Sequence, residues 1–400
     1  MKKRLGLISL VASIAVTSMQ AGELDLISDL KISGDARVRG VSVKGDTATS
    51  GSTAATRQDK QKFESRLRLN LDFKVDDSVS IHTRIVADNN AWGNNNNDTF
   101  TWDEAYVVVP FNQDKFLLAG RIEDSYGTKF YGSNGDPIDL ALVGYNPKPN
   151  ILLYAFDYKA VEGSVVDQGS SLGLSNTGNG DFDAYSIGGQ ITIDEMLMGG
   201  RYVYLQNNTA IGGGAYADAN SHMYNAFALG KYAGLDIQAQ VEKRTGDKYS
   251  GGIVDEKMFG AYLNIAKDFG DFKAGLSAVK TEKGYVSGSE LPVSYLTNDD
   301  LGMAALGRVG AYGDTSLYAA NFSYSPSADL TFEANLAHHS IDNASFNSIN
   351  KDLEIMEYDV GLSYNLTKNT QLSLRYAQGN FDEGNLEDLS VVVGAVEISF

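Results

Sequence analysis

The chain has 400 residues, a formal net charge of −18 and no cysteine. So acidic a chain repels phosphate backbones, which argues against nucleic acid as a partner, and the lack of cysteine excludes a disulfide-stapled exported domain. The length suits one large β-structure or about two to three soluble domains.

The N-terminal segment has the organisation of a secretory signal peptide. Lys2, Lys3 and Arg4 precede a short apolar stretch over residues 5–16, and Ala21 is a small residue suited to cleavage. We therefore expect residues 1–21 to be removed and residues 22–400 to form the exported protein. No later segment reaches the roughly 18 uninterrupted apolar residues of a transmembrane helix.

Period-two alternation dominates the remaining chain. Between residues 63 and 75, one face carries phenylalanine, leucine and valine with a single serine, while the other carries charged residues and one asparagine. A soluble strand is usually about 5–6 residues long, whereas a membrane strand needs about 9–11. Similar alternation recurs over residues 79–88, 235–242, 330–336, 356–365 and 371–376; over 197–206 and 223–232 the outward face is not evident.

Short turns alternate with long Gly-, Asn-, Ser- and Asp-rich loops. Eight turns and nine loops predict an all-β, transmembrane, antiparallel up-and-down β-barrel of about 18 strands, with short periplasmic turns and long external loops. A weak strand at 139–146 and a loop at 282–313 long enough to hold another hairpin leave 16 or 20 strands open. The turns are 76–78, 112–114, 147–149, 194–195, 233–234, 268–271, 326–328 and 367–369; the loops are 45–61, 89–101, 124–138, 161–181, 207–221, 245–256, 282–313, 342–352 and 382–388.

The final run, residues 390–400, ends on Phe400 with an apolar face that includes Val396 and Ile398. A barrel in lipid leaves no open edge, so this strand must pair with the first strand, at 30–43. Phe400 is then an interfacial aromatic at the closing seam. It also fits the C-terminal signature that outer-membrane barrels present to their assembly machinery. We expect the outer membrane as the location and its lipid as a partner.

An 18-stranded barrel is too wide to be filled by its own side chains, so function depends on what narrows it. The third long loop is the best candidate for folding inward, by analogy with porins, and it brings four acids: Glu123, Asp124, Asp136 and Asp139. The alternative is an ordinary external loop whose acids are simply solvated.

Five arginines occupy the polar faces of the first three strands and should cluster on one stretch of the lumen wall. Facing an acidic loop, they would set a transverse field that orients dipolar solutes. Alternatively, they pair locally with Glu64, Asp72 and Asp88. The five are Arg37, Arg39, Arg66, Arg68 and Arg84.

The export signal, the opening strand, Leu118-Ala119-Gly120-Arg121 ahead of an acidic loop, and the terminal Phe400 together resemble the Campylobacter-type major outer membrane porins. The resemblance implies a homotrimer of 18-stranded barrels that prefers cations and passes small hydrophilic solutes. It also implies a calcium ion at the constriction, for which Asp124, Asp136 and Asp139 could supply oxygen ligands. No other cofactor is expected.

No catalytic motif stands out, and the neighbouring histidines His338 and His339 are interpreted as a polar patch, so we expect no enzyme. The main hypothesis is a porin for passive diffusion of ions, cations preferred, and small hydrophilic solutes. The alternatives are a substrate-selective channel for a sugar or an anion along the arginine wall, and a structural or adhesive barrel.

Overall fold

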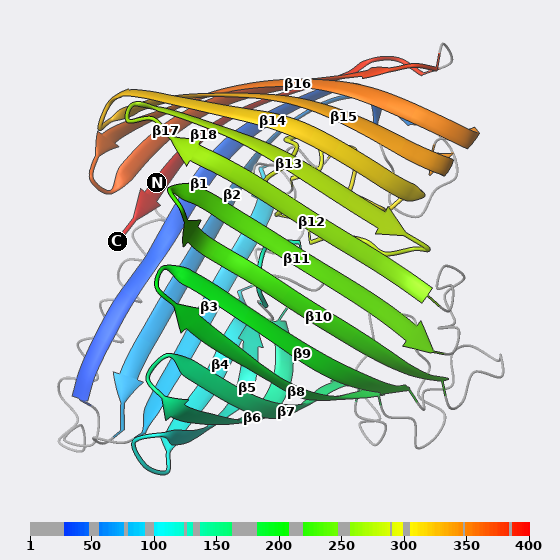
Figure 1. The fold of residues 1–400 in the computed structure, drawn as a ribbon. Helices are drawn as coiled ribbons and strands as arrows, with labels where there is room; N and C mark the ends of the chain where they lie inside the picture. The colour runs from blue at the N-terminus through cyan, green and yellow to red at the C-terminus, as the bar shows by residue number, and fades with distance from the viewer. Residues whose placement is uncertain are drawn as a thin grey trace.

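The computed structural model describes residues 28–47, 56–75, 79–92, 100–123, 126–130, 137–161, 182–207, 219–246, 257–288, 290–298, 305–346, 349–383 and 386–400. These residues form one antiparallel sheet of 18 strands that closes into a barrel (Figure 1). The strands are β1 (Ser28–Thr47), β2 (Thr56–Lys74), β3 (Ser80–Ala91), β4 (Thr101–Pro110), β5 (Lys115–Glu123), β6 (Pro137–Lys148), β7 (Ile151–Val161), β8 (Phe182–Ile193), β9 (Met196–Asn207), β10 (Ala219–Tyr232), β11 (Leu235–Gly246), β12 (Lys257–Asp268), β13 (Phe272–Glu282), β14 (Asp314–Ser327), β15 (Leu330–Phe346), β16 (Ile349–Thr367), β17 (Thr370–Phe381) and β18 (Leu389–Ser399).

The barrel closes where the sequence predicts, between the last strand and the first. β1 pairs with β2 on one side and with β18 on the other, in a register that runs from Asp35–Ser399 to Lys44–Ser390. Phe400 extends this seam, because its backbone N–H and C=O both bond to Gly34, at 3.0 and 2.9 Å. The expected count of 18 strands is confirmed, and the counts of 16 and 20 are wrong; the weak strand at 139–146 is β6.

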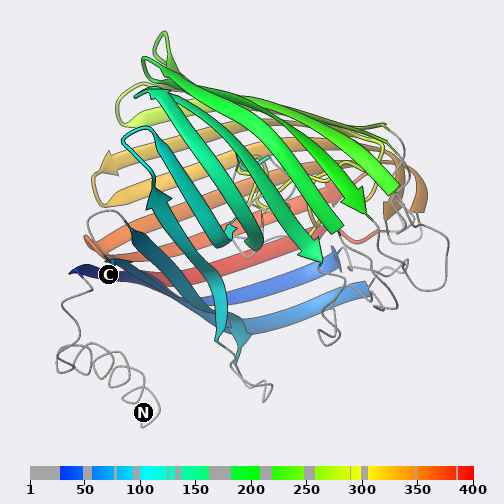
Figure 2. The same ribbon diagram turned by 90° about the horizontal axis from the view of Figure 1, so that it is seen from below.

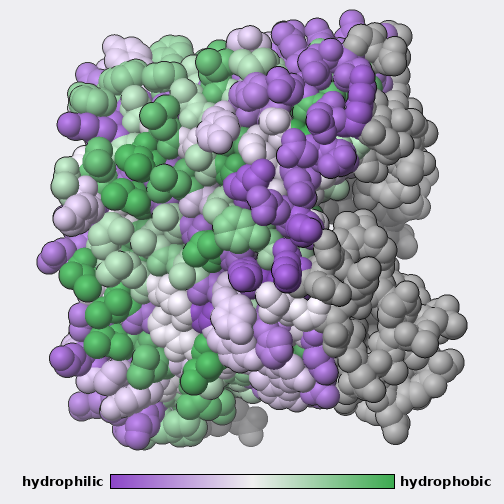
Figure 3. All heavy atoms as spheres, turned by 45° about the vertical axis from the view of Figure 1, so that its right-hand side comes forward, coloured by the Kyte–Doolittle hydropathy of each residue, from purple (hydrophilic) through white to green (hydrophobic). Residues whose placement is uncertain are grey.

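Side chains alternate between the lumen and the outside along every strand. Apolar and aromatic residues that remain exposed mark the outer face, and Figure 3 shows them over much of this side, with hydrophilic residues gathering toward the long loops. Aromatics lie outward beside the tight turns, the position of an interfacial girdle: Tyr232, Phe272, Tyr324, Phe332 and Tyr364. We call this the turn end and the opposite end the loop end.

The wall is uneven in height, since β5 has 9 residues whereas β2 and β16 have 19. The loop predicted at 342–352 is mostly strand, because β15 runs to Phe346 and β16 starts at Ile349. The predicted signal peptide and the turn at 76–78 lie outside the described residues. Within the described residues, no helix is long and apolar enough to cross a membrane.

The connection between β13 and β14 differs most from expectation. It was predicted as an external loop able to hide a hairpin, but its described residues, 283–288, 290–298 and 305–313, contain no strand and run inside the barrel (Figures 1 and 2). Leu291, Val293 and Leu296 are at most 1% exposed. Burial of these apolar side chains against the inner wall stabilises the inward path. We call this connection the 285–313 loop.

Candidate functional site

Two segments meet inside the barrel and narrow it. The described part of the third long loop, residues 126–130, touches the 285–313 loop through Phe130, whose ring stacks on Tyr285 with centroids 5.1 Å apart. The Tyr285 hydroxyl and the Gly288 N–H both donate to the Phe130 carbonyl, each at 3.2 Å. Lys129 pairs with Glu290 across the same contact. The two segments therefore form one partition in the lumen.

Gln240, on the inner face of β11, anchors the 126–130 segment to the wall. Its Oε1 accepts from the Thr128 N–H and hydroxyl, both at 2.7 Å, and its Nε2 donates to the Tyr126 carbonyl at 3.3 Å. The Arg201 guanidinium from β9 lies 4.2 Å from the centre of the Tyr126 ring, a cation–π contact. The inward folding expected for this loop is thus present over residues 126–130.

The 285–313 loop is held by two buried carboxylates on the inner face of β16. Glu357 accepts from the Ser294 hydroxyl at 2.5 Å and from the Leu296 N–H at 2.9 Å, and it lies 2.8 Å from His339 Nε2 on β15. Asp359 accepts from the Tyr295 N–H at 3.3 Å and from the Asn335 amide at 2.7 Å. Glu357 is fully buried, so its bonds cannot be replaced by water without moving the loop.

Burial raises the pKa of two tyrosines of the partition, Tyr295 and Tyr126. Burial, reinforced by the nearby Glu333 carboxylate, raises the pKa of Tyr295 above its usual value of about 10. Burial likewise raises the pKa of Tyr126, with the neighbouring Tyr154 hydroxyl as the second cause. Tyr295 is therefore neutral at pH 7, and its hydroxyl donates to Glu333 at 3.1 Å.

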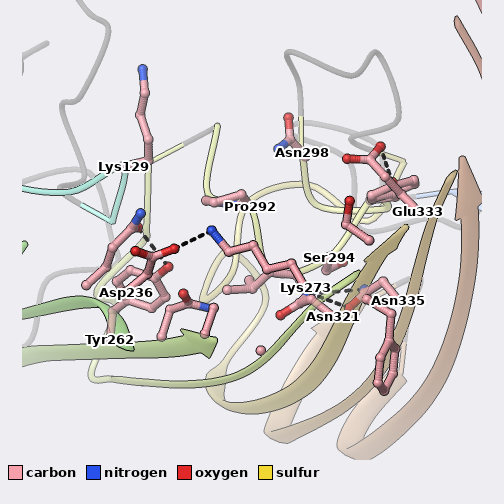
Figure 4. Close-up of a pocket in the computed structure, with 18 of the residues that line it drawn as sticks. Lys129, Asp236, Tyr262, Lys273, Pro292, Ser294, Asn298, Asn321, Glu333 and Asn335 are labelled. Carbon is pink, nitrogen blue, oxygen red and sulfur yellow. Dashed lines mark hydrogen bonds and ion pairs between the residues drawn. The ribbon is translucent and has the colours of Figure 1, made fainter. Parts of the chain in front are cut away.

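Between the partition and the turn end lies a cavity of about 800 Å³ (Figure 4). Asp236 and Lys273 are paired at 2.5 Å on one side, and Glu333 lies on the other. Lys231 and Arg375 add positive charge to the lining. The Lys129–Glu290 pair also reaches the lining. The rest of the polar lining is uncharged and rich in amides: Gln238, Asn264, Asn298, Asn321 and Asn335.

The five predicted arginines do lie together on the inner faces of β1, β2 and β3, and Arg37 stands directly opposite Arg66. Their contacts match local pairing better than an uncompensated basic wall, since each has a carboxylate within 4.0 Å. Three acids were expected as partners of these arginines. Glu64 does pair with one of them, Arg39, whereas Asp72 contacts His82 instead. The side chain of the third, Asp88, is not among those that the structure describes. The pairs are Arg37–Glu397, Arg39–Glu64, Arg66–Asp35, Arg68–Asp35, and Arg84 with Asp103, Glu104 and Glu123.

The four loop acids do not come together in the part of the chain that is described. Glu123 reaches Arg84 at 2.9 Å, so it joins the arginine wall. Asp139 pairs with Arg121 at 3.0 Å. Asp139 lies on the outer face of β6, because the same face carries the exposed Val143 and Tyr145. Asp124 and Asp136 lie outside the described residues.

No group of three or more acids or histidines able to hold a metal occurs among the described residues. The calcium ion therefore stays a prediction, because two of its three expected ligands, Asp124 and Asp136, are not described.

The two neighbouring histidines fall on opposite faces of β15, since His339 is buried against Glu357 whereas His338 points outward toward Glu354.

Sequence reasoning missed the residues that anchor the partition: Gln240, Glu357, Asp359 and the 285–313 loop itself. One signal was available, because residues 291–296 read Leu-Pro-Val-Ser-Tyr-Leu, a run too apolar for a solvated external loop. The anchoring carboxylates gave no such signal, since any inward position of a barrel strand is expected to be polar.

No protein-family model matches the chain, and no curated protein matches it. Among solved structures it is similar to Pseudomonas aeruginosa OccK2 (OpdF), with a TM-score of 0.60 and 13% identity over 93% of this chain and 98% of that one. The same protein in complex with glucuronate gives a TM-score of 0.59 and 11% identity, covering 93% and 97%. Escherichia coli Wzi, described as a carbohydrate-binding outer-membrane β-barrel, gives 0.51 and 12%, covering 92% and 85%.

At these identities the likeness concerns the fold. The chain has the fold of a bacterial outer-membrane β-barrel, closed from 18 antiparallel strands. The finer resemblance to Campylobacter-type porins stays a prediction.

Proposed function

We propose that the protein is an outer-membrane channel through which small hydrophilic solutes diffuse passively, with a partition that makes the passage selective. The observation that carries this proposal is the combination of a barrel wide enough for an aqueous lumen with two inward segments that leave a cavity of about 800 Å³, whose lining includes charged and amide side chains. That volume lies in the range of roughly 300–1,000 Å³ of small-molecule sites.

Selective passage fits the site better than a general pore. A general pore needs only an open lumen. Here both inward segments are fixed to the wall by buried hydrogen bonds, and they contact each other through Phe130 and Tyr285. The glucuronate bound by OccK2 and the carbohydrate binding of Wzi support a sugar-like solute over a bare ion. An anion ladder is less well supported, because the arginines of β1–β3 have carboxylate partners.

Reconstitution tests the proposal. Purified protein in a planar bilayer should give discrete conductance steps, and liposomes that contain it should swell in small sugars faster than in larger oligosaccharides. With a salt gradient, the net charge of −18 predicts a reversal potential of cation-selective sign. Protein that is folded by circular dichroism yet gives neither steps nor swelling would refute the channel and favour the structural or adhesive barrel. The homotrimer and the contact of the last strand with assembly machinery stay predictions.

A further inference from the structure

A row of hydrogen-bonded polar side chains crosses the inner wall beneath the 285–313 loop. It takes one residue from each of five consecutive strands, β12 to β16. Asn264 donates to Ser277 at 2.8 Å, Ser277 donates to Asn321 at 3.1 Å, and Asn321 donates to Asn335 at 2.6 Å. Asn335 then donates to the Asp359 carboxylate at 2.7 Å. We call these five residues the amide row.

The row has a fixed direction, because each of the other four members donates toward Asp359. An amide whose oxygen accepts from one neighbour and whose nitrogen donates to the next cannot flip without breaking both bonds. Asp359 is itself fixed by the Tyr295 N–H of the loop. The amides are therefore preorganised, which lowers the entropic cost of binding a ligand.

The row retains hydrogen-bonding capacity toward the cavity. Asn264, Asn321 and Asn335 line it. Asn335 uses both of its N–H donors, one on Asp359 and one on the Val293 carbonyl at 3.3 Å. Asn264 and Asn321 each donate one bond along the row, and an amide has two N–H donors and one acceptor oxygen, so these two keep capacity for a ligand. Adjacent hydroxyl groups of a sugar ring both donate and accept, so they match such groups. Tyr262, labelled in Figure 4, and Tyr295 also line the cavity, and an aromatic ring can pack against the C–H face of a sugar.

The charges of the cavity are largely compensated. Lys129 pairs with Glu290, and Asp236 pairs with Lys273 and lies 4.0 Å from Lys231. Glu333 and Arg375 both line the cavity and oppose each other in sign. The lining thus offers many neutral donors and acceptors and little net attraction for either an anion or a cation.

We propose that the amide row, with Tyr262 and Tyr295, is a binding site for a neutral sugar inside the passage. This inference rests on the proposed channel function, and it names the solute class and the residues that recognise it. The site lies on strands β12–β16, away from the arginine wall of β1–β3.

Current block by sugar in the full-length channel tests the site. Glucose should reduce the KCl current saturably, whereas polyethylene glycol of matched hydrodynamic radius should lower it only as it lowers bulk conductivity. Asn264→Ala, at the end of the row, should weaken the glucose block on the order of tenfold, with the block of each variant expressed as a fraction of its own KCl current. The matched control is Gln371→Ala, because Gln371 is an inner-face amide at the turn end bonded to Asn365 and outside the cavity lining; its block should equal that of the unaltered protein.

Three results would overturn the site: equal block by glucose and the polymer, equal glucose affinity in Asn264→Ala and Gln371→Ala, or block by glucuronate at least tenfold stronger than by glucose, which would indicate an anion site. Calorimetry of detergent-solubilised protein with glucose separates the two proposals. Binding heat that Asn264→Ala reduces, in a protein without conductance, would uphold the sugar site and reject the channel. Conductance without binding heat or block would reject only the sugar site.

Discussion

Replacing Glu357 by alanine should free the 285–313 loop from the wall. The substitution removes the acceptor for the Ser294 hydroxyl and the Leu296 N–H, which belong to the loop, and the contact with His339. A buried donor left without a partner costs about 1–3 kcal/mol, so the two loop donors weaken docking by about 2–6 kcal/mol. At 1.4 kcal/mol per tenfold, the docked-to-undocked ratio falls by roughly 30- to 10⁴-fold.

Single-channel recording and proteolysis measure this loss. The Glu357→Ala channel should show larger conductance and frequent substates, and trypsin should cleave at Arg308, which lies within the loop. Glu357→Gln keeps one acceptor oxygen and should be intermediate. Glu354→Gln is the control on the same strand, because Glu354 lies on the outer face beside His338. If Glu357→Ala matched Glu354→Gln in conductance, in current noise and in resistance to trypsin, the anchoring role of Glu357 would be wrong.

Three further perturbations follow from the contacts. Gln240→Ala removes the bonds to Thr128 and Tyr126 and should weaken docking of the 126–130 segment by about 1–3 kcal/mol. Single-channel records should then show added low-conductance flicker. Records like those of the unaltered channel would contradict the anchoring role of Gln240. Deletion of Phe400 removes two backbone hydrogen bonds to Gly34 at the seam and the aromatic ring that covers Gly34. The fraction of folded barrel, measured as the heat-modifiable band on gels, should fall, while the conductance of the barrels that do form stays constant. A normal folding yield would contradict this prediction. Arg84→Gln leaves Asp103, Glu104 and Glu123 without their shared cation and should raise cation selectivity in reversal-potential measurements, and an unchanged or more anion-selective potential would count against it.

The barrel itself was predictable because its signals are local. Alternation within a strand and the sequence of short turns and long loops depend on neighbouring residues, and they predicted the strand number. The pairing of β18 with β1 then followed because a barrel in lipid leaves no open edge. The outward faces of β9 and β10 could not be predicted, since Val203 and Phe227 are apolar yet face inward, where they pack around Tyr126.

The partition depends on contacts far apart in sequence, and this limited what could be foreseen. Ser294 and Glu357 are 63 residues apart, and Thr128 and Gln240 are 112 apart. The third loop was expected to fold inward and does so over residues 126–130, but its neighbour in the lumen is the 285–313 loop rather than the arginine wall. The place of the arginines on the polar faces of three consecutive strands predicted where they lie. The compensation of their charge depended on acids such as Asp35 and Glu104, which were not considered.

Thiol labelling in a recording channel tests most directly whether the cavity is the route of passage. The chain has no cysteine, so a single one can be placed on the cavity wall by Ser323→Cys and on the outer face of the same strand by Ala320→Cys. A charged, membrane-impermeant methanethiosulfonate should lower the current of Ser323→Cys in irreversible steps and leave that of Ala320→Cys unchanged. Full modification of Ser323→Cys, verified by mass, with no change in current would contradict the account.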